Sequence, residues 1–244
     1  MSFVPAPNQS SIQTALWNFL TNILPSGTEV ILGQQNRVPE PEGGDFVIFT
    51  PIRRDRISTN IDVYADCAFT ASIAGNVLDV SAIQFGVVGI GNTLFGVNIA
   101  SGITILNQLT GPIGGAGTYT LSASQTVSSE VMACGIENIL QPTRVVIQID
   151  VHGPNSADNA QTISTLFRDD YGVQQFASSG FDVIPLYADD PKQVPFVNAE
   201  QQYETRWIVE AAMQANQTIS GLPQQFAGEL TFNPPVNVTV TYPT

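Results

Sequence analysis

Residues 68–133 alternate polar and apolar side chains over a long stretch in which no helical pattern occurs. They contain only two charged residues, Asp79 and Glu130. The alternating runs are each about as long as a strand, and turns that contain glycine separate them. The run around Gly75 and Asn76 has the pattern of a tight hairpin. This stretch therefore predicts a small all-β barrel or sandwich of about five or six strands.

The segments on either side contain two helical patterns. Residues 10–24 place apolar side chains at helical spacing, and either Ser10 or Ser11 could cap this helix. A second helix is predicted after Asn155 or Ser156. Both helices would bury one apolar face.

The same flanking segments also contain runs rich in β-branched and aromatic residues, which predict strands. The clearest is residues 144–153, where four apolar side chains alternate with more polar ones. The other predicted strands are residues 28–33, 45–52, 58–66, 181–187, 203–219 and 228–242. Residues 203–219 are rich in Ala and Gln, so they could instead be partly helical. Together the flanks predict an α+β fold, a mostly antiparallel sheet with two packed helices.

This order of patterns predicts a discontinuous domain, residues 1–67 and 134–244, with residues 68–133 inserted as a second domain. The ends of an inserted domain lie close together. Cys67 and Cys134 stand at these ends, so they form the candidate neck of the insert. The sequence leaves open whether they form a disulfide or pack as two thiols.

Charge limits what the protein could bind. The chain has a formal net charge of -13, yet only 12% of its residues are charged. A surface that neutralises phosphates needs clustered cations, so tight DNA binding is not expected. Low charge favours association, which indicates a protein that works in an assembly. The alternative is a monomer that its uncharged polar residues keep soluble. No signal peptide or membrane span is predicted.

No catalytic, cofactor-binding or metal-binding pattern is present. Asp150 and His152 could point to one face of their strand, but no nucleophile elbow accompanies them, so a hydrolase is a weak alternative. The acidic pairs at 169–170 and 189–190 lack calcium-loop spacing. We therefore expect a protein that is not an enzyme and has no cofactor.

Two parts of the sequence resemble bacteriophage proteins. The pattern D-x-x-G-P-N-x-A-D, which begins at Asp150, and the pattern Y-x-x-R-W, which begins at Tyr203, resemble the phage neck or tail terminator family. This resemblance covers residues 10–66 and 140–219. The run G-x-G-T-Y-T-L-S-x-S-Q-T-V-S-S, which begins at Gly115, is similar to a β-module of phage structural proteins.

The resemblance implies a virion protein of the neck or tail that is assembled in the host cytoplasm. It implies a homo-oligomeric ring, a hexamer, that joins the head connector or portal-side protein to the tail tube protein. DNA would pass through the hole of the ring without tight binding, which an acidic chain suits.

A ring needs two different faces of the subunit in contact, so residues that anchor interfaces become candidates. Arg53, Arg54 and Arg56 form the basic cluster of the sequence, and they could pair with carboxylates of the next subunit, form ion pairs within the chain, or touch DNA. Arg206 and Trp207 are further candidates, because Arg and Trp dominate hot spots. Packing of Trp207 in the core is the alternative.

A second function is compatible with the same sequence. The inserted β-domain could recognise a host surface or a glycan instead of serving assembly. The aromatic residues that could form a sugar-binding platform are Phe69, Phe85, Phe95 and Tyr119. In so small a domain these residues could equally form the core.

Overall fold

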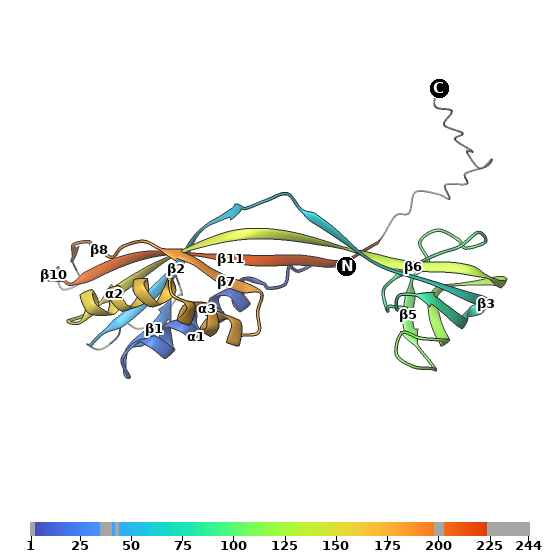
Figure 1. The fold of residues 1–244 in the computed structure, drawn as a ribbon, viewed down its shortest axis with the longest axis horizontal. Helices are drawn as coiled ribbons and strands as arrows, with labels where there is room; N and C mark the ends of the chain where they lie inside the picture. The colour runs from blue at the N-terminus through green and yellow to red at the C-terminus, as the bar shows by residue number, and fades with distance from the viewer. Residues whose placement is uncertain (1–2, 35–40, 42–43, 198–202, 224–244) are drawn as a thin grey trace, which may run out of the picture. The chain divides into compact units, whose positions relative to one another are not determined.

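The computed structural model describes residues 3–34, 41, 44–197 and 203–223 (Figure 1). The chain divides into two compact units. Of the described residues, unit 1 contains those up to Val63 together with those in Asn138–Gly221, and unit 2 contains Tyr64–Glu137 with Leu222 and Pro223. The strand predicted at residues 228–242 lies outside the described residues.

Unit 1 is a sheet with helices, as an α+β fold requires. Its helices are α1 (Gln9–Ile23), α2 (Ser156–Phe167) and α3 (Asp170–Ser178). Its main strands are β1 (Glu29–Leu32), β2 (Phe46–Arg56), the part of β6 (Gly117–His152) from Asn138 onward, β11 (Arg206–Pro223) and β7 (Val183–Ala188), in the order β1-β2-β6-β11-β7. Because β1 runs parallel to β2 while β2 runs antiparallel to β6, the sheet is mixed.

Three short strands complete this unit. β8 (Lys192–Gln193) pairs with β11. β9 (Phe196–Val197) and β10 (Tyr203–Glu204) form a separate antiparallel pair.

The core of unit 1 lies between the three helices and one face of the sheet, as Figure 1 shows. The alternation predicted for residues 144–153 is confirmed. The side chains of Val145, Ile147, Ile149 and Val151 are fully buried in this core, which places Arg144, Val146, Gln148 and Asp150 on the opposite face. This opposite face carries the polar side chains of the candidate subunit interface.

Helix α1 begins two or three residues earlier than the serines suggested. Its N-cap is Asn8, whose Oδ1 accepts a hydrogen bond from the backbone N–H of Ser11 at 2.9 Å. The prediction that Ser10 or Ser11 caps the helix was therefore wrong. Asn is as good a cap as Ser, because its side-chain oxygen reaches the same unpaired N–H groups.

Replacing Asn8 with alanine should destabilise unit 1 by about 1 kcal/mol, because the Ser11 N–H loses its acceptor. The measurement is urea unfolding followed by tryptophan fluorescence, since Trp17 and Trp207 both belong to unit 1. Asn8→Asp, which keeps an acceptor oxygen, is the control and should stay near wild type. An equal loss in both variants would contradict the capping role.

Helix α2 has Asn155 at its N-cap, as one of the two alternatives predicted, but its side chain does not cap the helix. Instead the Asp45 carboxylate accepts hydrogen bonds from the Asn155 backbone N–H at 2.9 Å and from Nδ2 at 2.8 Å. A negative charge at a helix N-terminus is also favourable to the helix dipole.

Helix α3 was missed by the two-helix prediction. It is short, Asp169 caps it by accepting from the Tyr171 N–H at 3.0 Å, and of its residues only Gly172 and Phe176 are buried. Glycine normally indicates a break in a helix. Here a Cβ at Gly172 would lie 2.6 Å from the Leu166 carbonyl oxygen, so glycine is needed for the close approach of α3 to α2.

Unit 2 is built from strands around its own core. It contains most of β3 (Ile61–Phe85), together with β4 (Thr93–Phe95), β5 (Ile105–Gln108) and the first part of β6. Within β3, Gly75 has a φ of +66°, as the first central position of a type II′ turn requires. The Ser81 hydroxyl donates to the Thr70 carbonyl at 3.0 Å, so the two arms of this hairpin lie together.

Candidate subunit interface

The three arginines of the basic cluster do not share one environment. They lie at the end of β2, where Arg54 pairs with Val145 of β6 and therefore points to the helix side of the sheet. There its guanidinium donates to the side-chain oxygens of Gln217 at 3.2 Å and of Gln9. Arg54 is thus held within the subunit.

Arg53 lies on the opposite face, where it shares a carboxylate with Arg144. The Asp55 Oδ2 accepts from Arg53 Nε at 2.9 Å, from Arg144 Nη2 at 2.8 Å and from Arg144 Nε at 3.1 Å. The hydrogen bonds from Arg144 hold the pKa of Asp55 below its usual value, with the charge of Arg53 adding to the effect. Asp55 therefore stays ionised at neutral pH.

A groove of about 430 Å³ opens beside this cluster. We call it the arginine groove. Its residues come from the end of β2 and the residue that follows it (Asp55, Arg56 and Ile57), from within β6 (Arg144), and from β7 and β11 (Leu186, Tyr187 and Gln214). The sheet register brings these four strands side by side, although their residues are far apart in the sequence. Sequence reasoning identified Arg56 but not Arg144, Leu186 or Tyr187.

Arg206 is held inside unit 1 by an ion pair. Its Nη2 and Nε donate to the Asp150 Oδ1 at 2.6 and 2.9 Å, and its guanidinium lies 5.7 Å from the centre of the Phe196 ring. Asp150 is buried and also accepts from Gln148 at 2.9 Å. Trp207 is half-buried and packs against the core of unit 1.

His152 is enclosed by other side chains and does not meet Asp150. Its ring stacks on Phe46 with 4.5 Å between centroids, and Phe196 meets it edge-on at 5.4 Å. Its Nδ1 lies 2.9 Å from the Glu204 carboxylate, while Asp150 is occupied by Arg206. A hydrolase would need a histidine between an aspartate and a nucleophile, and these contacts do not form that arrangement.

Within the described ranges, no group of three or more His, Cys, Asp or Glu residues is arranged to hold a metal ion. No helix of the described part is long and apolar enough to cross a membrane.

Cys67 and Cys134 are both free thiols in the core of unit 2. Asn92 Nδ2 donates to the Cys134 sulfur at 3.3 Å. Burial raises the pKa of the Cys67 thiol to about 12, and the neighbouring Cys134 adds to the rise. Burial also raises the pKa of Cys134. Both groups are therefore protonated thiols at neutral pH.

In the native protein at pH 8, we expect both thiols to resist labelling by a soluble maleimide or disulfide reagent. The reason is that neither is exposed and neither ionises. The urea-unfolded chain should react completely in the same time, which is the control. Rapid labelling of the folded protein would contradict this packing.

The four aromatic residues considered for a glycan platform are not equivalent. Phe69 and Tyr119 are fully buried in the core of unit 2, so their faces cannot stack on a sugar. Phe95 is half-buried and Phe85 is exposed.

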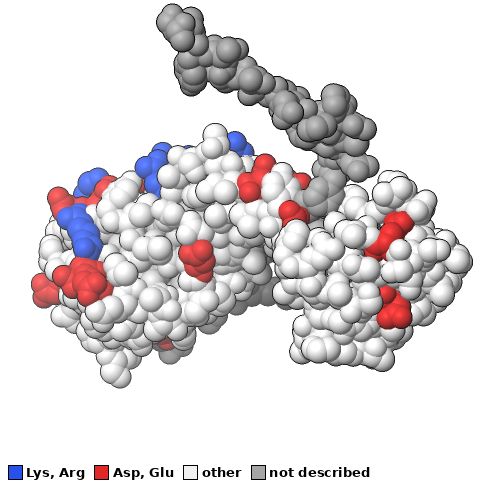
Figure 2. Space-filling model, turned by 45° about the vertical axis from the view of Figure 1, so that its right-hand side comes forward, with Lys and Arg blue, Asp and Glu red and all other residues white. Residues whose placement is uncertain are grey.

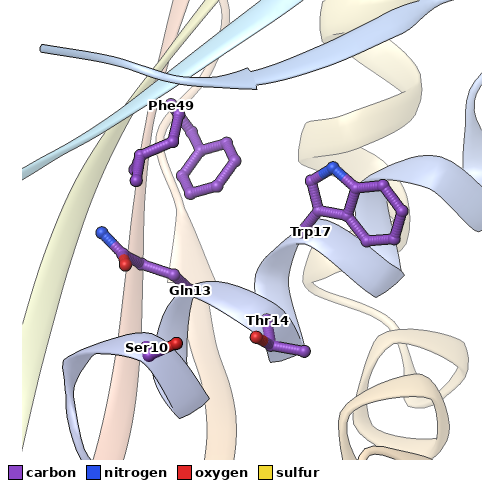
Figure 3. A pocket seen from close by; sticks show the side chains of 6 residues that line it. Ser10, Gln13, Thr14, Trp17 and Phe49 are labelled. Carbon is purple, nitrogen blue, oxygen red and sulfur yellow. The ribbon is translucent and has the colours of Figure 1, made fainter. Parts of the chain in front are cut away.

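A second pocket, of about 220 Å³, lies in unit 1 between α1 and the first two strands. Figure 3 shows Trp17, Gln13, Thr14 and Ser10 projecting from α1, with the ring of Phe49 on the strand side. The Trp17 indole N–H donates to the Val30 carbonyl at 3.2 Å, which ties α1 to β1. None of the six residues that line this pocket carries a charge.

Comparison with known families decides the identity. Residues 102–239, more than half of the chain, match the sequence profile of a family described as phage neck terminator protein. The chain belongs to this family. A search of curated proteins gave no match.

The matched region of the neck terminator family includes all of β6 together with α2, α3, β7 and β11. It therefore contains Arg144, Leu186, Tyr187 and Gln214 of the arginine groove. Membership of this family indicates a structural role in the phage neck or tail.

Proposed function

We propose that this protein forms a homo-oligomeric ring, a hexamer, at the junction between the phage head and tail. The observation that carries the proposal is the match of residues 102–239 to the neck terminator family. The ring would contact the head connector or portal-side protein on one side and the tail tube protein on the other. It would be assembled in the host cytoplasm and remain in the virion.

DNA would pass through the hole of this ring without being bound tightly. A net charge of -13 supports this part of the proposal, because a lumen that attracted phosphates would slow the passage of DNA. Most described cations are also engaged with side chains of the same subunit.

Residues 68–133 are proposed as an inserted barrel or sandwich domain, with residues 1–67 and 134–244 forming the ring domain around it. The absence of Lys and Arg from residues 64–137 supports a role in packing against other virion proteins, since this unit has little charge to keep it apart from them. Its surface in Figure 2 is largely uncharged, with a few acidic side chains. The buried Phe69 and Tyr119 give the glycan-binding alternative no support.

The ring is tested by measuring the mass of the purified protein by light scattering and by imaging it with electron microscopy. We expect about 160 kDa for six copies of the 26.1 kDa chain, and closed rings with a central hole. A monomer at all concentrations, with no rings on the grid, would overturn the proposal of a self-assembled ring.

A further inference from the structure

The arginine groove lies on the face of the sheet that the helices leave open. Val145 packs towards the helices, so its neighbour Arg144 points away from them. Gln214 lies between the buried Met213 and Ala215 of β11, so it points to the same open face as Arg144. At the C-terminal end of β6 this face is covered, because Phe196 lies against His152. Around Arg144 the described side chains leave the face open, and this opening is the arginine groove.

The groove has an excess of positive charge. Arg53 and Arg144 share Asp55, the one carboxylate of the groove lining, and Arg56, which also lines the groove, forms no ion pair with any described residue. The remaining ion-paired cations of the described chain each have a carboxylate of their own: Arg168 with Asp190, Lys192 with Asp189, and Arg206 with Asp150. The groove therefore has more guanidinium groups than carboxylates.

The groove is also partly apolar. Ile57, Leu186 and Tyr187 line it and are 48%, 42% and 42% exposed. Apolar and aromatic side chains beside arginines are the composition of a protein interface. A site for the DNA backbone would instead present cations with little apolar surface.

We propose that the arginine groove receives a carboxylate-bearing surface of a second copy of this chain, and so forms one side of the contact between subunits. This inference rests on the ring proposed above. The charge balance supports the choice of partner, since 21 Asp and Glu residues face only eight Lys and Arg residues in each chain. A different face of the neighbour would supply the carboxylate, as ring contacts require.

The first test is Arg56→Glu in the full-length protein, with Lys192→Glu as the matched control. Both variants change the net charge equally, but Lys192 is 70% exposed and lies outside the groove. We expect Arg56→Glu to weaken self-association at least about 10-fold in sedimentation experiments, because like charges then meet. Lys192→Glu should assemble as the wild type does. Circular dichroism checks that both variants are folded.

The second test identifies the neighbour's carboxylate. Lys192 is the chain's single lysine, so the double variant Arg56→Lys, Lys192→Arg keeps the charge and places the one lysine in the groove. A carbodiimide joins this amine to a carboxylate in contact with it. With an equal mixture of ¹⁴N- and ¹⁵N-labelled protein, we expect crosslinked peptides from Lys at position 56 that contain both isotopes.

The outcomes separate the two proposals. Rings that persist in Arg56→Glu, with no mixed-isotope crosslink, would overturn the groove as an interface and leave the ring proposal standing. A wild-type protein that never associates would overturn both. If Arg56→Glu instead lowers affinity for a DNA duplex while assembly is unchanged, the groove binds DNA and our assignment is wrong.

Discussion

Replacing Phe19 with alanine is expected to lower the free energy of unfolding of unit 1 by about 4 kcal/mol. Phe19 of α1 meets Phe167 of α2 and Phe176 of α3 with 5.5 Å between ring centroids in each case, and these two rings are 5.6 Å apart. All three are fully or almost fully buried. Removal of the Phe19 ring therefore leaves a cavity where the three helices join.

The measurement is urea unfolding monitored by tryptophan fluorescence, which reports unit 1. Tyr203→Ala is the control, because Tyr203 is 86% exposed and its removal should change stability by less than about 0.5 kcal/mol. Phe19→Leu should fall between the two. A loss below about 1 kcal/mol for Phe19→Ala would mean that the three rings are not packed as described.

Removing the guanidinium in Arg206→Ala is expected to destabilise unit 1 by about 3 kcal/mol. Two of the hydrogen bonds to the Asp150 carboxylate come from Arg206, and after its removal Gln148 is the remaining side-chain donor among the described residues. Asp150 is only 7% exposed, so its charge would be buried without a cation. The cost of that uncompensated charge is larger than the net contribution of the ion pair itself.

The double variant Asp150→Asn, Arg206→Ala tests this reasoning, because it removes the uncompensated charge. It should be more stable than Arg206→Ala alone, and the difference is measured as a double-mutant cycle by urea unfolding. Lys192→Ala removes the surface pair with Asp189, at 3.7 Å, and should have little effect. If the double variant is no more stable than Arg206→Ala, the loss comes from packing of the arginine side chain instead.

Strong periodicity allowed parts of this fold to be predicted. The apolar face of α1 and the alternating residues of β6 were both identified, because each pattern continues over several turns or pairs. Helix α3 was missed since it is nine residues long and contains a glycine. The parallel pairing of β1 with β2 was also missed, because strand direction depends on contacts that no local pattern encodes.

The candidate interface could be predicted only in part for a related reason. The cluster Arg53, Arg54 and Arg56 is visible in the sequence, yet strand alternation turns Arg54 to the helix side. Arg144 and Tyr187 lie near this cluster, on the open face of the sheet, only because of the register of β2, β6, β11 and β7. That register is set by the folded sheet, so sequence reasoning had no means to place them.

The strand β6 contributes to both cores, with Cys134 buried in unit 2 and Val145 buried in unit 1. Within unit 1 the side chains of this strand alternate, so inserting one residue between Val145 and Val151 would turn part of this apolar row out of its core. Evolution can therefore change the length of this protein in its turns, but a single-residue insertion or deletion between Val145 and Val151 would be selected against. The spacing along this part of β6 should accordingly vary less among homologous phages than the lengths of the loops.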